Sequence, residues 1–109
     1  MKLYIAVLDE VPDHIVPTLV AHAVLGAHMK FMGEYADYNS WLVSSFKKVV
    51  LKVNRKEFDK ISALTGVYLA HENTTLNATK SCAVVCPREE YPNVLKFAKM
   101  WQPSLPSPP

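Results

Sequence analysis

Apolar runs separated by short polar breaks divide the chain into predicted strands and helices. Residues 2–8 (KLYIAVL) are apolar at nearly every position, which is typical of a central strand buried on both faces. Residues 47–53 (KKVVLKV) predict a second strand, and the runs at 67–70 (VYLA) and 81–86 (SCAVVC) predict two more. The pattern therefore predicts about four strands.

The first helix is predicted between the first two strands. It begins at Asp13, a residue type that caps helices, and continues to Gly33, a common C-terminal stop. Small residues recur along it, which allows a helix to lie close to a sheet: Ala21, Ala23, Gly26 and Ala27.

Two further helices are predicted later in the chain. Asn54 and Glu57 have the spacing of a capping box, and they predict a short helix that ends before Gly66. Residues 88–101 predict a last helix with a proline in its first turn, where proline is tolerated. Residues 34–46 are aromatic but have no clear periodicity.

The predicted element order is β-α-β-α-β-β-α. We therefore expect one α/β domain over residues 1–101, with an approximately four-stranded mixed sheet and helices packed on it. Alternation of strands and helices favours parallel pairing, and the consecutive third and fourth strands allow one antiparallel neighbour. Residues 102–109 contain four prolines among eight residues and predict an extended tail.

Composition excludes several classes of protein. The net charge of +2 over 109 residues does not by itself indicate nucleic-acid binding. With no signal-peptide pattern and no apolar run of about 18 residues, we expect a cytoplasmic protein that does not enter a membrane. Cys82 and Cys86 would lie about 13 Å apart in one strand, so we expect reduced thiols in the core. No metal-ligand spacing or glycine-rich phosphate loop is present, so no metal or cofactor is expected.

The connection between the third and fourth strands is long and rich in amides and hydroxyls. One interpretation is an ordinary hairpin loop. The other is one wall of a pocket, because such groups can read a nucleobase edge or hold ribose and phosphate oxygens. The candidate ligand-binding residues in it are Asn73, Thr74, Asn77 and Thr79, and the candidate catalytic residues are His71 and Thr75.

Three candidates lie elsewhere. His14, just before the first helix, could supply a cation or a general base near neutral pH, or it could be an exposed loop histidine. His22 is either functional or a buried, hydrogen-bonded helix histidine. Tyr38 could stack on a base, whereas core packing is the simpler fate of Trp41.

Taken together, the run KLYIAVL, the helix segment AHAVLGA, the strand FKKVVLKV with a preceding tryptophan, and SCAVVCP after a polar loop are similar to the peptidyl-tRNA hydrolase 2 family. The similarity covers roughly residues 2–100. It implies the element order given above, a dimer, and a site that hydrolyses the ester between a peptide and the 3′-ribose of tRNA. It also matches His22 and Ala23 to a histidine–alanine motif of the family.

The chain departs from the family at positions that carry its chemistry. The family's lysine and glutamine of the first helix correspond to Ile15 and Leu19, and its aspartate at the start of the polar loop corresponds to Leu69. The threonine–glutamine pair falls on residues 73–74 or 74–75. An isoleucine cannot stabilise an oxyanion, and a leucine cannot orient water.

Three hypotheses follow. The first is a pocket that binds or cleaves a free or cyclic nucleotide, in a homodimer whose compact size and divergence would suit a phage counter-defence protein. The second is peptidyl-tRNA hydrolysis by different residues, with tRNA as partner. The third is a non-catalytic dimeric interaction protein in which the polar connection is only a loop.

Overall fold

Strand β1 is the centre of the fold, and every residue in it after Lys2 is buried. The computed structural model describes residues 1–71 and 79–104. The elements in chain order are β1 (Lys2–Leu8), the short 3-10 helix η1 (Asp13–Ile15), α1 (Val16–Phe31), α2 (Ala36–Val43), β2 (Lys47–Val53), α3 (Arg55–Ser62), β3 (Val67–His71), β4 (Lys80–Val85), α4 (Asn93–Lys96) and β5 (Lys99–Met100).

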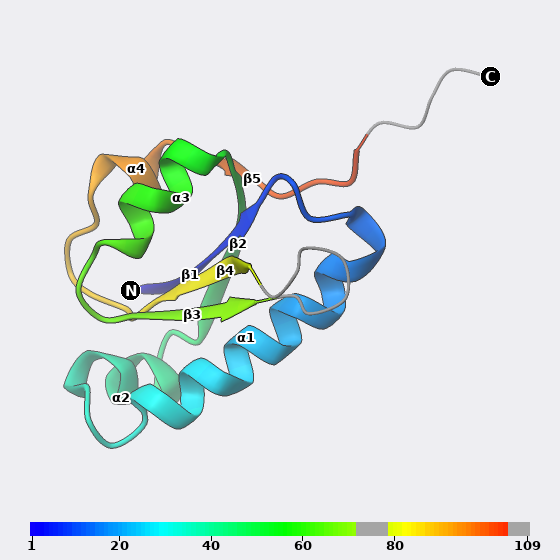
Figure 1. Ribbon diagram of the computed structural model, residues 1–109. Coiled ribbons are helices and arrows are strands. Elements are labelled where there is room, and N and C mark those ends of the chain that lie inside the picture. Colours follow the sequence, from blue (N-terminus) through cyan, green and yellow to red (C-terminus); the bar gives the residue numbers. More distant parts are fainter. Residues whose placement is uncertain (72–78, 105–109) are drawn as a thin grey trace.

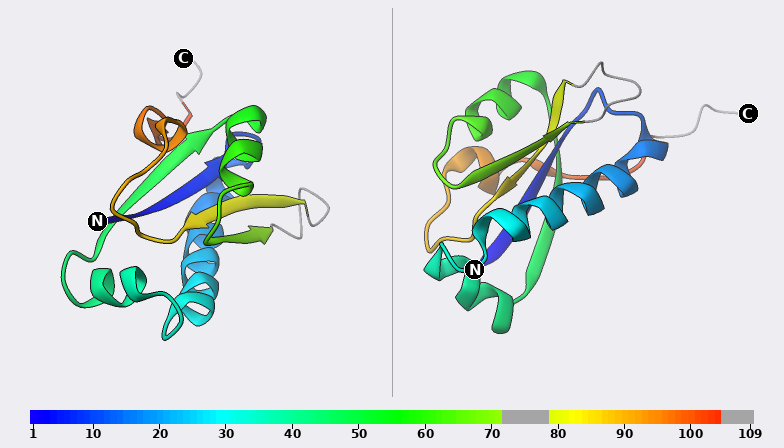
Figure 2. Two further views of the ribbon diagram at one scale, coloured as in Figure 1. Left: turned by 90° about the vertical axis from the view of Figure 1, so that its left-hand side faces the viewer. Right: turned by 60° about the horizontal axis from the view of Figure 1, so that its bottom comes forward.

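The strands form one mixed sheet in the order β3-β4-β1-β2-β5 (Figure 1). β1 pairs with β2 in parallel and with β4 in antiparallel, and β3 and β5 pair antiparallel with β4 and β2. The strands β1, β2 and β3 therefore run in the same direction, and their carboxyl ends meet at one edge of the sheet. Helix α1 covers one face, and α3 with α4 covers the other (Figures 1 and 2).

The predicted α/β domain with a mixed sheet is confirmed, but the sheet has five strands instead of four. The prediction of a helix over residues 88–101 is wrong, because only Asn93–Lys96 is helical and Lys99–Met100 is a strand. The open edge of β2 explains the difference. Pairing with β5 satisfies backbone N–H and C=O groups of β2 that would stay unpaired if residues 88–101 formed a helix. The segment without periodicity contains the helix α2.

The helix boundaries follow local sequence signals to different degrees. The capping box of α3 is present in both directions, with the Asn54 side chain accepting from the Glu57 backbone and the Glu57 carboxylate accepting from the Asn54 backbone. Asp13, in contrast, caps no helix, because its carboxylate accepts hydrogen bonds from the backbone and hydroxyl of Ser104 in the tail. No helix in residues 1–71 and 79–104 is long and apolar enough to cross a membrane.

Close packing of α1 on the sheet depends on its small residues, as predicted. Ala23 and Ala27 are fully buried, and Gly26 lies directly on the ring of Tyr68 in β3. Ala21, in contrast, is exposed and takes no part in this packing. A methyl group added at Gly26 would come within 2.3 Å of the Tyr68 hydroxyl oxygen and 2.5 Å of its ring carbon Cζ. The glycine is therefore required by the approach of the helix to the strand.

Replacement of Gly26 by alanine should lower the free energy of unfolding. Overpacking against Tyr68 costs about 1–3 kcal/mol, and this exceeds the gain of about 1 kcal/mol in helix propensity. In a Tyr68→Leu background, where the ring is absent, the same substitution should become stabilising. Urea denaturation of the four proteins tests both signs, and a Gly26→Ala effect that is equal in the two backgrounds would contradict the packing argument.

Candidate functional site

The carboxyl edge of the parallel strands is the first candidate site. The chain leaves β1 toward α1 on one face and leaves β2 toward α3 on the other face. Adjacent parallel strands whose connections diverge in this way leave a crevice beyond their carboxyl ends, where α/β proteins bind ligands. The backbone amide of Asp9 donates to the carbonyl of Val53 at 2.8 Å, so the two chains separate only after this bond.

Four of the predicted site residues lie toward this edge. His14 is exposed in η1, His71 is exposed at the end of β3, and Thr79 is exposed just before β4. Helix α1 runs antiparallel to β3, because Gly26 packs on Tyr68 and the Lys30 amine donates to the Val67 carbonyl at 3.2 Å.

His22 lies one helical turn before Gly26. Because α1 runs antiparallel to β3, this places His22 nearer to the carboxyl end of β3 than Gly26 is. It is exposed, which excludes the alternative of a buried helix histidine. The remaining candidates in the polar connection, Asn73, Thr74, Thr75 and Asn77, lie outside the described residues.

Tyr38 is not brought together with these histidines. It is 2% exposed in α2, near the C-terminal end of α1, and its hydroxyl is 2.8 Å from Nδ1 of His28. Burial raises its pKa, with a further contribution from Cys86. Trp41 is also buried, as predicted, and its indole nitrogen donates to the Lys47 carbonyl at 2.8 Å. Tyr38 is therefore a core residue, and a base could not stack on it without opening α2.

Two features of the carboxyl edge were not predicted from the sequence. The hydroxyl of Ser81, which is 0% exposed, has no hydrogen-bond partner in the structure as far as the described residues show. A serine within an apolar strand was the available signal. The second feature is a pair of adjoining cavities of about 480 and 410 Å³, both lined by Lys52 and Lys99. The pairing of β2 with β5 creates them, so the sequence pattern could not reveal them.

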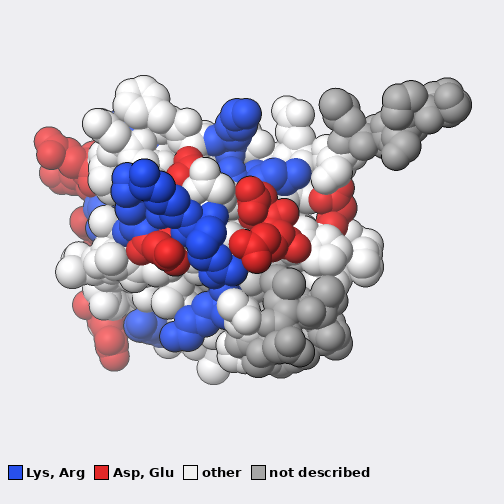
Figure 3. Space-filling view, turned by 45° about the horizontal axis from the view of Figure 1, so that its top comes forward, with Lys and Arg blue, Asp and Glu red and all other residues white. Residues whose placement is uncertain are grey.

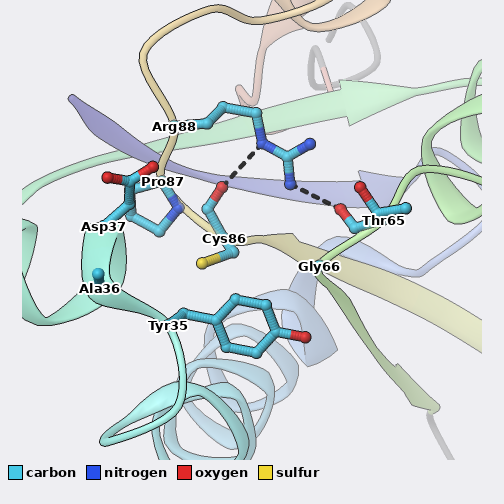
Figure 4. A pocket seen from close by; sticks show the side chains of 8 residues that line it. All are labelled: Tyr35, Ala36, Asp37, Thr65, Gly66, Cys86, Pro87 and Arg88. Carbon is cyan, nitrogen blue, oxygen red and sulfur yellow. Dashed lines mark hydrogen bonds between the residues drawn. The ribbon is translucent and has the colours of Figure 1, made fainter.

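A separate pocket of about 420 Å³ lies at the opposite edge of the sheet (Figure 4). Its Arg88 guanidinium is fixed by two backbone carbonyls, donating from Nε to Cys86 at 3.1 Å and from Nη2 to Thr65 at 2.7 Å. Gly66 has a φ of +67°, and an added Cβ would lie 3.2 Å from the same guanidinium. The Tyr35 ring and the Asp37 carboxylate complete the wall (Figure 4).

The thiol in this pocket is poorly suited to nucleophilic chemistry. Burial raises the pKa of Cys86 to about 11, with Arg88 lowering it and Asp37 raising it by smaller amounts. Burial likewise raises the pKa of Cys82 to about 12. Since only a thiolate is an effective nucleophile, both cysteines are unreactive near neutral pH. Both are free and buried, as the sequence predicted.

Within the described residues, no group of three or more His, Cys, Asp or Glu side chains is arranged to hold a metal ion. No protein-family model matches the chain, and a search of curated proteins finds no significant match. The site therefore has to be interpreted from its own geometry.

The buried thiols should make stability depend on alkaline pH. Because their folded pKa values lie above the ordinary value of 9, their contribution is complete below pH 9 and is lost as the pH rises toward 11 and 12. We expect the free energy of unfolding to fall across this range in urea titrations, and Cys82→Ala to make the fall less steep. An equally steep fall in Cys82→Ala would show that the thiol is not responsible.

Proposed function

We propose that the chain is a divergent relative of peptidyl-tRNA hydrolase 2 that binds or hydrolyses a small free or cyclic nucleotide at the carboxyl edge of its sheet. The observation that carries the proposal is that His14, His71 and Thr79 are exposed at the carboxyl ends of the parallel strands, with exposed His22 in the N-terminal half of α1. A role in phage counter-defence and a cytoplasmic location are part of the same hypothesis.

The chemistry of these side chains suits a polar ligand. Exposed imidazoles can donate a hydrogen bond, carry a positive charge or accept a proton near neutral pH. The Thr79 hydroxyl can donate to phosphate or ribose oxygens and accept from a base edge. The buried Ser81 hydroxyl, two residues further along in β4, has no partner among the described residues, which costs about 1–3 kcal/mol.

The family's original reaction has weaker support. Leu19, which stands where the family has its glutamine, is 4% exposed and belongs to the core. Ile15, at the position of the family's lysine, is partly buried against the same core. Neither residue can position water or stabilise an oxyanion, so ester hydrolysis would need the histidines instead. Peptidyl-tRNA hydrolysis is therefore the alternative, with tRNA as the partner.

Incubation of the pure protein with mononucleotides, cyclic nucleotides and cyclic dinucleotides, alongside an N-acylated aminoacyl-tRNA, separates these activities. We expect one nucleotide to raise the melting temperature or to be converted, as read by chromatography. His14→Ala and His71→Ala should each reduce the affinity for this nucleotide or its rate of conversion by roughly tenfold or more. That is the usual contribution of a positioned acid–base or charged group.

His28→Gln serves as the control, because His28 lies near the other end of α1 and an amide can replace its hydrogen bond to Tyr38. This variant should retain the nucleotide effect. Release of the acylated amino acid from tRNA, without any nucleotide effect, would favour the alternative. If none of these ligands is bound or converted, both the nucleotide proposal and the peptidyl-tRNA alternative are contradicted.

A non-catalytic homodimer is the second candidate, and the outer face of α1 favours it. Leu25 and Met29 in α1 and Met32 directly after it are 64%, 77% and 54% exposed, and the four-residue spacing puts Leu25 and Met29 on one side of the helix. Beside this ridge is an apolar groove of about 370 Å³, with Val24 and Trp41 in its walls. A ridge and a groove side by side on one face suit a two-fold pairing, in which the ridge of each copy enters the groove of the other.

Disruption of this face tests the homodimer. Met29→Glu puts a charge on the ridge, so we expect it to convert a dimer into a monomer by light scattering coupled to size-exclusion chromatography. Phe97→Glu, which changes an equally exposed apolar residue outside this face, is the matched control and should remain dimeric. A wild-type monomer at all concentrations, or equal dissociation in both variants, would contradict this face as an interface.

A further inference from the structure

Two lysines are directly opposite each other where β5 joins the sheet. Lys52 in β2 pairs with Lys99 in β5 in the antiparallel register. Directly opposite residues of antiparallel strands project on the same face with Cβ atoms about 4.5–5.5 Å apart, and like charges in such pairs are destabilising. This arrangement therefore needs an explanation.

Within the described residues, neither lysine forms an ion pair with a carboxylate. The ion pair in the described part of the chain joins Arg55 to Glu10 at 3.2 Å, and it involves neither lysine. The Lys52 amine lies 5.3 Å from the centre of the Trp101 ring, a contact that holds a cation without cancelling its charge. On the face that carries α3 and α4, basic and acidic side chains are mixed (Figure 3), so the case for an anion site depends on this local pair.

Protection of the sheet edge does not explain both residues. Lysines on edge strands prevent further strands from pairing, and this accounts for Lys99 in β5. Lys52 is in β2, which has a neighbour on both sides and needs no such protection. The half-buried Lys52 is instead positioned under the tail, where it lines a cavity together with Lys99.

This cavity has the size and the lining for an anionic group. Its volume is about 480 Å³, and Gln102 and Ser104 line it together with the two lysines. The Ser104 hydroxyl and backbone amide already donate to the Asp13 carboxylate, so the Gln102 side-chain amide is the neutral donor available in the lining. The adjoining cavity of about 410 Å³ also contains Asp9 and Glu57, so it is the less favourable of the two for an anion. The Glu57 carboxylate accepts a hydrogen bond from the backbone N–H of Asn54 at 2.9 Å.

We propose that Lys52 and Lys99 form a binding site for the phosphate groups of a small ligand, in the cavity between β2, β5 and the start of the tail. Two ammonium groups supply the charge, and the Gln102 amide supplies a neutral donor. The site is separate from the histidines near β3, and it does not depend on the nucleotide proposal above.

Calorimetric titration of the whole protein with inorganic pyrophosphate tests the site. We expect saturable binding that weakens with added NaCl, because salt screens exposed charges. Lys52→Gln and Lys99→Gln should each weaken binding about tenfold, the typical effect of losing one charged hydrogen bond. Lys47→Gln, at the exposed opposite end of β2, is the matched control and should change binding less than about twofold.

Melting temperatures measured without ligand separate binding from folding. Relief of the repulsion should leave Lys99→Gln at least as stable as the wild type, while the stabilisation by pyrophosphate is lost.

Titrations with ATP and adenosine distinguish the source of the phosphate. Tighter binding of ATP than of pyrophosphate indicates a nucleotide, and equal binding indicates phosphate alone. Adenosine binding as tightly as ATP, no binding of pyrophosphate, or an equal loss in Lys47→Gln would overturn the proposal.

Discussion

Burial of β1 on both faces is the constraint from which the rest of the architecture follows. A strand without a solvent face needs a helix on each side of the sheet, and α1 and α3 supply them. The chain steps from β1 to the adjacent β2 in one direction and then returns past β1 and β4 to β3. Right-handed crossovers in opposite directions lie on opposite faces of the sheet. The same reversal of direction therefore covers both faces of the core and makes the chain diverge at the carboxyl ends of β1 and β2.

The side chains at the carboxyl ends of the parallel strands consequently differ in chemistry from those at the opposite ends. The carboxyl edge gathers exposed imidazoles, hydroxyls and the paired lysines, all of which interact reversibly with polar or anionic groups. The opposite edge carries Arg88 and Cys86, but the guanidinium is already bound to two carbonyls and the thiol is neutral because its pKa is raised. Reversible recognition at the carboxyl edge is therefore better supported by the side chains than covalent chemistry at the other edge.

The sequence predicted the elements whose signals are local. Apolar runs specified four strands, the Asn54–Glu57 spacing specified the start of α3, and small residues indicated the close approach of α1 to the sheet. Helix α2 had no such signal, because it is held by contacts between rings from different elements. The Tyr38 ring packs against Phe31 of α1 with 5.6 Å between ring centres, and the periodicity of one segment does not record a contact between two elements.

Strand β5 escaped prediction for a related reason, and the lysine pair with it. Residues 93–101 have the composition of a helix, and two paired residues carry too little pattern to indicate a strand. What decides the conformation is the open edge of β2, where the Trp101 amide donates to the Val50 carbonyl at 2.8 Å. Pairing at this edge satisfies backbone groups and covers Lys52 with an indole ring, but it also sets Lys99 against Lys52. A fold that accepts this repulsion beside a cavity keeps two lysines together with no ion pair among the described residues, and an anion is the simplest group to offset their charge.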